Sequence, residues 1–385
     1  MDHVHSQAMI RLNSRMFRWL FVYGAIAIAC ITFDSFAQSV FGPGIFQGLL
    51  QSDSDNDESF GFMTLTLKAT GTFTMKFNLG VNRVGHHAYS KAGQFSDVGS
   101  YHFEGPAVTD TRYAIARIID LQLDSVDSPT FIHGMVSDGT HSSTIELERV
   151  TVFGAGSSAA QTGRYTFLFA NPEEPGFPHG FGFGTVTVSS KGRISASGRS
   201  ADGMSFRQTA ALTVGGRWPI FAKLGGITKG ILSGWMSFEE KTTSDFAGPL
   251  IWLGPEVPGP NNAFVPEFSG TASAVGSRYV APSGKVLQTS DSTNNAHLTL
   301  GEGGLQMPIE RDLTLTPANK FIFTDGVKPD ALSVSPSTGF FTGRFLHSEG
   351  ETDVFRGVIL QKQNFGGGFF FDRGGEVGRV VLQPQ

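Results

Sequence analysis

Cysteine is almost missing from this 385-residue sequence. The only one, Cys30, lies in an apolar segment near the N-terminus. If that segment is removed on export, the remaining chain cannot form a disulfide, so its stability must come from packed cores alone. Such cores can form, because 40% of the residues are hydrophobic.

Charged residues are also scarce, at 16% of the chain, and the formal net charge is only −5. This balance gives no electrostatic reason to bind nucleic acid or an anionic membrane surface. Tyrosine is rare, with 6 residues, whereas there are 35 Phe and 49 Gly. A chain rich in Gly, Thr, Ser and Phe favours strands and tight turns over helices.

Residues 1–37 are predicted to be an export signal. Basic residues at Arg11, Arg15 and Arg18 precede an apolar run from Trp19 to Ile31, which is too short for a confident membrane span. Small residues then favour cleavage after Ala37. We therefore expect a secreted or periplasmic, cell-surface protein with no membrane span after cleavage; an uncleaved N-terminal anchor is the alternative.

A second alternative concerns Cys30 itself. The run Ala27-Ile28-Ala29-Cys30 is similar to the lipobox of bacterial lipoproteins, although Ala stands where Leu is usual. Lipid anchoring through Cys30 is therefore the minor alternative for localisation.

An internal repeat is the strongest signal in the rest of the chain. The segment Phe60–Thr66 recurs as Phe181–Thr187, and a third, partial copy matches Thr70–Phe77 to Thr338–Phe345. Repeats of this kind decide the architecture. They predict a first β-repeat unit over residues 38–155, a second over 156–262, and a C-terminal β unit with the partial third repeat over 263–385.

Apolar and polar residues alternate within the repeat. Met63 and Leu65 alternate with Thr64 and Thr66, which indicates a strand with one buried face and one wet face. Gly71 follows in a predicted turn. The sequence thus predicts an all-β fold of repeated antiparallel β-meander units forming small barrels or sandwiches, with Phe side chains on the inward faces.

Two further segments carry a resemblance. Together with the Gly-Phe strands, Gly216–Phe221 and Phe355–Gln361 resemble the β-repeat regions of uncharacterised secreted proteins of environmental bacteria. The resemblance covers most of residues 44–382. It implies an exported β fold, but it brings no established activity and no catalytic residues.

Acidic and histidine clusters give only weak site candidates. Asp53, Asp55 and Asp57 alternate in a way that could ligate a hard cation. The calcium-loop pattern fails, however, because Glu58 stands where Gly is needed, so a solvated loop is the preferred interpretation. The adjacent His86 and His87 would point to opposite faces of a strand, so they cannot easily share one metal. His102 could be a third ligand, but nothing in the sequence fixes its position, and an exposed insertion is the preferred interpretation.

No catalytic motif for a nucleophile, a zinc site or a phosphate loop is present, so no catalytic residue and no cofactor is predicted. The pairs Glu173-Glu174 and Glu239-Glu240 are expected to be loop charge. The tryptophans at 218, 235 and 252 could form a sugar-stacking face, but core positions are favoured.

These observations predict an exported β-repeat protein with a structural or binding role, whose partner is a glycan or a cell-surface component. Recognition would lie on the loops 53–59, 86–99 and 172–180. An extracellular polymer hydrolase is the first alternative, because two carboxylates suffice for that chemistry. An outer-membrane β-barrel is the second alternative, because its strands also alternate.

Overall fold

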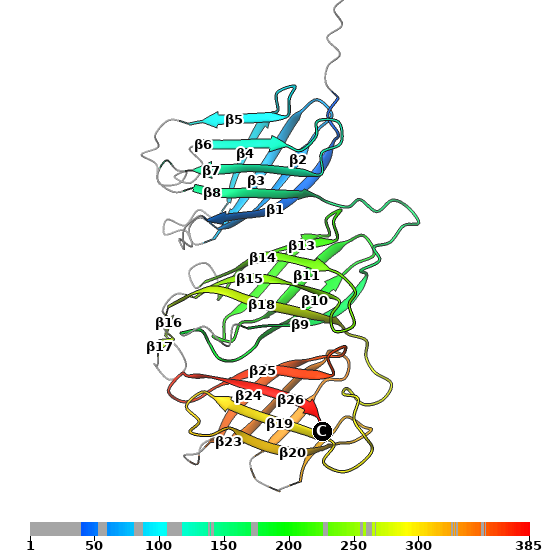
Figure 1. Cartoon of the computed structure of the whole chain (residues 1–385), viewed down its shortest axis with the longest axis vertical. Coiled ribbons are helices and arrows are strands. Elements are labelled where there is room, and N and C mark those ends of the chain that lie inside the picture. The colour runs from blue at the N-terminus through cyan, green and yellow to red at the C-terminus, as the bar shows by residue number, and fades with distance from the viewer. Residues whose placement is uncertain are drawn as a thin grey trace, which may run out of the picture. The chain divides into compact units, whose positions relative to one another are not determined.

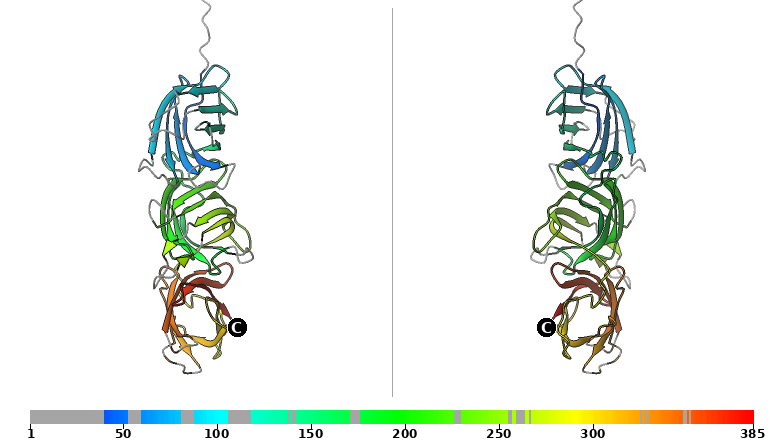
Figure 2. Two further views of the ribbon diagram at one scale, coloured as in Figure 1. Left: turned by 90° about the vertical axis from the view of Figure 1, so that its left-hand side faces the viewer. Right: turned by 90° about the vertical axis from the view of Figure 1, so that its right-hand side faces the viewer.

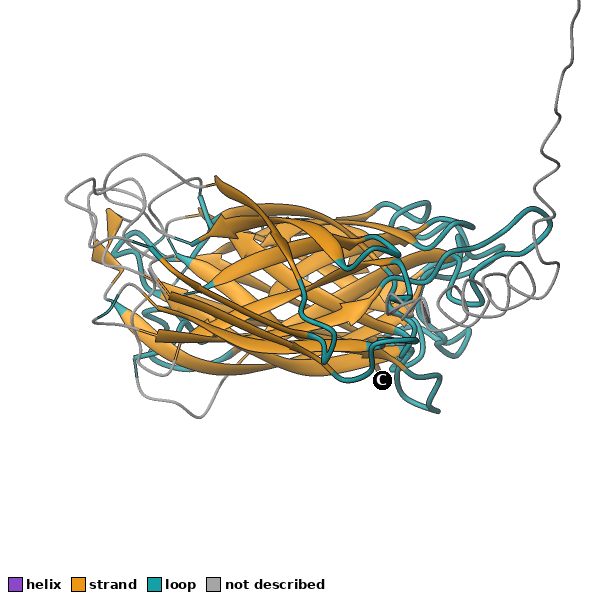
Figure 3. Ribbon diagram, turned by 90° about the horizontal axis from the view of Figure 1, so that it is seen from above, coloured by secondary structure: helices purple, strands orange, loops and turns teal. Residues whose placement is uncertain are grey.

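Strands are the only regular elements in the described part of the chain (Figure 3). The computed structural model describes residues 40–52, 60–80, 88–105, 118–137, 139, 142–170, 176–225, 230–254, 257–258, 264–265, 267–324, 326, 328, 330–347, 350 and 352–385. These residues form three eight-stranded antiparallel sheets, each curled into a near-closed barrel (Figures 1 and 2). The predicted all-β meander fold is therefore confirmed, in its barrel form.

The first barrel has the strand order β4-β3-β2-β1-β8-β7-β6-β5, so β1 closes onto β8 and the two end strands are β4 and β5. Its strands are β1 (Gly44–Ser52), β2 (Gly61–Leu67), β3 (Thr72–Leu79), β4 (Ala88–Gln94), β5 (Ser100–Glu104), β6 (Ile118–Leu123), β7 (Phe131–Ser137) and β8 (Ser142–Arg149).

The second barrel repeats this order as β12-β11-β10-β9-β18-β15-β14-β13. Its strands are β9 (Gly163–Ala170), β10 (Gly182–Val188), β11 (Arg193–Arg199), β12 (Ser205–Ala211), β13 (Arg217–Lys223), β14 (Ile231–Phe238), β15 (Phe246–Gly254) and β18 (Phe268–Arg278). A small separate sheet, β16 (Val257–Pro258) with β17 (Phe264–Val265), lies in the connection between β15 and β18.

The third barrel has a different order, β21-β20-β19-β26-β25-β24-β23-β22. Its end strands are β21 and β22, so two strands precede this pair in the chain and four follow it. Its strands are β19 (Ala296–Glu302), β20 (Ile309–Leu315), β21 (Phe321–Phe323), β22 (Ala331–Val334), β23 (Phe340–Leu346), β24 (Thr352–Leu360), β25 (Phe365–Phe371) and β26 (Val377–Pro384).

Inward faces are apolar because successive residues of a strand point to opposite faces. In β2 and β3, Met63, Leu65, Phe73 and Met75 are buried, while Lys76 lies on the exposed face. The first and third barrels each enclose an apolar cluster of their own, and the cluster of the second barrel extends into the third. The burial of these apolar side chains supplies the stability that disulfides do not.

The core of the second barrel is aromatic. Trp218 and Trp252 have no exposed surface. Their rings meet Phe167 and Phe169 nearly edge-on, at centroid separations of 6.2 and 5.4 Å. Edge-to-face pairs of this kind stabilise a core beyond the area that they bury. Both tryptophans are therefore core residues, as expected.

Each barrel has two rims, because successive connections of a meander alternate between the two ends of its strands. One rim, here called the turn rim, has matching connections in the first two barrels: 68–71 and 189–192, 95–99 and 212–216, 124–130 and 239–245. The other, the loop rim, carries the segments of more variable length.

Glycine is required at the turn rim. Gly71, Gly192 and Gly339 have φ angles of 79°, 71° and 76°, a region that residues with a Cβ rarely adopt. In each case a Cβ would also lie 2.5 to 2.7 Å from an aromatic ring, that of Phe41, Phe153 or Tyr279. The partial third copy of the repeat thus shares this turn with the other two.

The repeated Phe-Gly-Phe motif connects barrels. In the second copy Gly182 faces inward, where a Cβ would lie 2.3 Å from the ring of Phe169. Its neighbour Phe183 therefore points outward. There it contacts Phe340 and Phe369 of the third barrel, at centroid separations of 5.9 and 5.6 Å.

The first copy behaves in the same way. Phe60 and Phe62 pack in an apolar cluster with Phe221 and Ile231 of the second barrel. The expectation of inward Phe side chains is confirmed for Phe73 of β3. It is wrong for Phe60 and Phe62, because the alternation that turns Met63 inward turns Phe62 outward.

A buried carboxylate joins the first two barrels. Glu148 of β8 has no exposed surface. Its Oε2 lies 2.7 Å from Nε of Arg217 in β13, and its Oε1 accepts the backbone N–H of Gly215 at 2.6 Å. The same guanidinium pairs with Glu146 at 2.8 Å and lies 4.1 Å from the ring centroid of Trp235.

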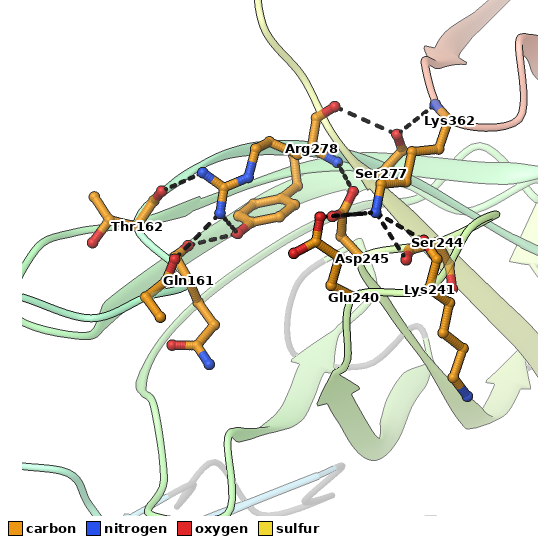
Figure 4. A network of polar contacts seen from close by, with 11 residues as sticks. Gln161, Thr162, Glu240, Lys241, Ser244, Asp245, Ser277, Arg278 and Lys362 are labelled. Atoms are coloured by element: carbon orange, nitrogen blue, oxygen red, sulfur yellow. Dashed lines mark hydrogen bonds and ion pairs between the residues drawn. The ribbon is translucent and has the colours of Figure 1, made fainter.

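Lys362, in the turn after β24, ties the third barrel to the second (Figure 4). Its Nζ lies 2.9 Å from Oδ1 of Asp245 and donates to the carbonyl of Lys241 at 2.8 Å. Its backbone N–H donates to Oγ of Ser277 at 2.9 Å. The other carboxylate oxygen of Asp245 accepts the N–H of Arg278 at 2.6 Å. Residues Val40–Gln385 accordingly make up one unit.

Of the two expected boundaries between β units, one falls between two barrels and the other falls inside a barrel. The boundary at residue 155 falls between β8 and β9, whereas the one at 262 falls inside the second barrel, because β18 pairs with β9 and β15. The breakers in Gly254–Asn262 mark a connection, but they do not tell whether it joins two barrels or two strands of one. The predicted signal, residues 1–37, lies outside the described residues, and among those described no helix is long and apolar enough to span a membrane.

Candidate functional site

A groove of about 1080 Å³ lies where the second barrel meets the third. Strands β10 to β13 supply one wall, and strands β22 to β24 supply the other. The contact between Phe183 and Phe340 borders the groove, so its shape depends on the same outward phenylalanine that connects the barrels.

The groove is cationic. Four of its lining side chains carry positive charge, namely Arg199, Arg207, Lys223 and Arg356, and none of its described lining residues is acidic. Hydroxyl groups complete the polar lining, from Ser197, Ser205, Ser333, Ser335 and Thr342. This composition contrasts with the net negative charge of the whole chain.

Two of these side chains are partly desolvated, and the charges of Arg199 and Arg356 repel each other. Burial lowers the pKa of Lys223 from 10.5 to about 8. Burial, and then the nearby charge of Arg199, lowers the pKa of Arg356. Within the described part of the chain, no carboxylate forms an ion pair with any of the four. A negatively charged ligand would relieve the repulsion, because an opposite charge favours the protonated forms.

Strand register sets the positions of the arginines. On the outward face of the second barrel, Arg199 is paired with Ser205 and Arg207 with Ser197. The two arginines are therefore diagonal neighbours on adjacent strands. Arg199 is also held by its own turn, since its Nη1 donates to the carbonyl of Gly203 at 3.1 Å.

The other two cations come from chain segments farther along. The backbone N–H of Gly225 donates to the carbonyl of Ser205 at 3.0 Å, which fixes the end of β13, and so Lys223, beside the start of β12. Arg356 enters from the third barrel, where it is paired with Thr342 across β23 and β24.

A second hollow, of about 520 Å³, adjoins the groove and shares Ser197 and Arg207 with it. Hydroxyl side chains dominate its lining, from Thr185, Thr187, Ser195, Ser197 and Thr209. Together the two hollows offer a charged region followed by a hydroxyl-rich region on one outward face.

The residues singled out from the sequence do not gather at this groove. Asp53, Asp55, Asp57, His86 and His87 lie outside the described residues, as does the pair at 173–174. Among the residues that are described, no group of three or more His, Cys, Asp or Glu is placed to hold a metal ion.

Other candidates have structural partners. Nδ1 of His102 lies 2.6 Å from Oδ1 of Asp120 on the neighbouring strand. Glu240 lies 3.6 Å from Lys362 in the network between the second and third barrels. Trp235, for which a core position was favoured, is half-buried under Arg217 and packs against the apolar cluster that contains Phe221 and Ile231.

The groove residues could not be selected from the sequence alone. Alternation places Ser195, Ser197 and Arg199 on a wet face, and the same pattern describes many exposed strands. These side chains form a site only because the barrel closes and because Arg356, more than 150 positions after Arg199, lines the same groove. Neither feature can be recognised in a short stretch of sequence.

The sequence matches no protein-family profile and no curated protein. Among solved structures it is similar to the isotype 1 transferrin binding protein B of Neisseria meningitidis serogroup B, at 9% sequence identity and a TM-score of 0.18. The alignment covers 84% of this chain and 66% of that one.

Proposed function

We propose that this protein is an exported binding protein that holds an anionic extracellular ligand in the groove between its second and third barrels. The observation that carries the proposal is the set of four cations without a carboxylate partner in the described chain. Partly desolvated charges are costly for a protein to maintain, and a bound anion offsets that cost.

Arginine suits this role. Its planar guanidinium donates in a fixed fork that matches carboxylate, sulfate and phosphate oxygens. Serine and threonine hydroxyls beside the cations can add hydrogen bonds to a sugar or to the anion itself. The expected glycan partner is thereby narrowed to a glycan that carries negative charge.

Export rests on the signal predicted at residues 1–37, and surface attachment through Cys30 remains its minor form.

Neither alternative function is favoured by the groove. A hydrolase of this kind needs a carboxylate pair, whereas the described lining is cationic. A membrane barrel needs an apolar outward band, whereas Thr74 and Lys76 are exposed on β3.

Binding can be tested with heparin, a sulfated polysaccharide, in a calorimetric titration of the exported chain. We expect saturable binding at low salt, and a loss of about tenfold or more in affinity for the double variant Arg199→Gln, Arg356→Gln, because each arginine supplies charge-assisted hydrogen bonds. Both side chains are exposed, so the barrels should remain folded.

Lys76→Gln is the matched control, because it removes an exposed cation from the outward face of the first barrel. The control should bind heparin as the unaltered chain does. Equal affinity of the control and the groove variant would show that binding is a general property of surface charge and would overturn the assignment of the groove. Polygalacturonate and neutral dextran, used in the same titration, test whether the groove requires an anion.

A further inference from the structure

The outward face beside the groove is organised in rows that cross three strands. Pairing among β10, β11 and β12 aligns Phe183 with Arg199 and Ser205, then Thr185 with Ser197 and Arg207, then Thr187 with Ser195 and Thr209. Successive rows lie about 6.7 Å apart, because they are separated by two residues along each strand.

The chemistry changes along these rows. The first row borders the third barrel and contains Arg199, and the second contains Arg207. The third row has only hydroxyl side chains, and all three of them are exposed. The second hollow follows the second and third rows, so it continues the groove in the same direction.

A ligand that uses both hollows must be extended, with negative charge at one part and hydrogen-bonding groups at the next. We infer that the ligand is a linear anionic polysaccharide that lies across the rows, with an anionic sugar unit at Arg199, Arg207 and Arg356 and the next units over Thr187, Ser195 and Thr209. This inference rests on the proposed function and specifies its substrate class.

Single-stranded nucleic acid is also a linear anion, but it is held by exposed aromatic side chains on which the bases stack. Here the aromatic residue in the rows, Phe183, is only 4% exposed, because it is covered by the third barrel. Hydroxyl groups that face solvent suit the hydroxyl-covered surface of a sugar chain instead.

The test compares heparin-derived oligosaccharides of increasing length, from the disaccharide upward, for the unaltered chain and for the double variant Thr187→Val, Thr209→Val. We expect affinity to rise with length in the unaltered chain. In the variant the affinity of the longer oligosaccharides should fall roughly threefold or more, while that of the disaccharide stays unchanged, because only the hydroxyl row has been lost.

The double variant Thr66→Val, Thr74→Val is the control, since it removes two exposed hydroxyls from paired positions on the first barrel. It should bind every oligosaccharide as the unaltered chain does. If affinity does not depend on length, or if the hydroxyl variant binds long oligosaccharides normally, the inference of an extended polysaccharide is refuted. The proposed anion site at the groove would be unaffected by that result. If the disaccharide and heparin both fail to bind, the proposed function itself fails. Tighter binding of oligo-deoxythymidine than of heparin would overturn the assignment to polysaccharide.

Discussion

Asp202 offers a sharp test of the energetics of the second barrel. Its side chain lies in the turn between β11 and β12 and is 4% exposed. Its carboxylate accepts a hydrogen bond from Oγ of Ser200 and one from the backbone N–H of Met204. These bonds do not offset its burial, which raises its pKa from 3.8 to about 6.

The raised pKa sets the sign of the pH dependence. Between pH 3.8 and about 6 the folded state keeps the proton that the unfolded state has lost, so stability falls as pH rises through this window. Above about pH 6 the carboxylate is charged in both states, and its burial lowers the free energy of unfolding by the full amount that the pKa difference sets. At about 1.36 kcal/mol for each pKa unit, that amount is about 3 kcal/mol.

We therefore predict that Asp202→Asn, which stays neutral, gains about 3 kcal/mol of unfolding free energy relative to the unaltered chain between pH 4 and pH 7. Urea unfolding followed by tryptophan fluorescence measures this, because Trp218, Trp235 and Trp252 all lie in the second barrel. Asp97→Asn, at an exposed turn of the first barrel, is the control for loss of a surface charge. If the difference between Asp202→Asn and the unaltered chain does not change with pH, the carboxylate is not destabilised by its burial and the reasoning fails.

Three further predictions concern single side chains. Arg217→Met should destabilise the contact between the first two barrels by about 3–5 kcal/mol, because it leaves the fully buried carboxylate of Glu148 unpaired; a loss below about 1 kcal/mol in urea unfolding would contradict this. Gly71→Ala should lower the free energy of unfolding by at least about 1 kcal/mol, because φ is 79° and the added Cβ would meet the ring of Phe41. Gly284→Ala is the control: no heavy atom lies within 4 Å of the added Cβ, so the melting temperature should change little. Affinity for the heparin disaccharide should fall as pH rises through about 8, where Lys223 loses its proton, and Lys223→Met should remove this pH dependence; a fall of equal size in Lys223→Met would assign it to another group.

Much of the fold was predictable, because a strand with one wet face leaves a period of two in the sequence. Met63 and Leu65 are inward as that pattern requires, and the turn glycine at Gly71 has the positive φ that a tight turn uses. Alternation also assigns Phe62 to the opposite face from Met63. The expectation of an inward Phe holds for Phe73 but fails for Phe62, whose side chain packs in the contact with the next barrel and not in the core of its own.

The limits of the third unit were harder to predict. A loop that joins two barrels and a loop that joins two strands of one barrel have the same Pro- and Gly-rich composition. Composition therefore could not assign β18 to the second barrel. The groove was less predictable still. Arg199 and Arg356 are ordinary exposed residues in the sequence, and they share a site only because two barrels meet. Clusters that attract attention in a sequence are local, whereas this site is made by distant segments.

The separation of the two rims has a consequence for how such a chain can change. A residue inserted into a turn such as 68–71 shifts the register of the following strand, and a shift of one residue exchanges its inward and outward faces. An insertion at the loop rim lengthens a connection and leaves every strand pair where it was, at a small entropic cost. Changes in the length of connections are therefore expected to gather at the loop rim of each barrel.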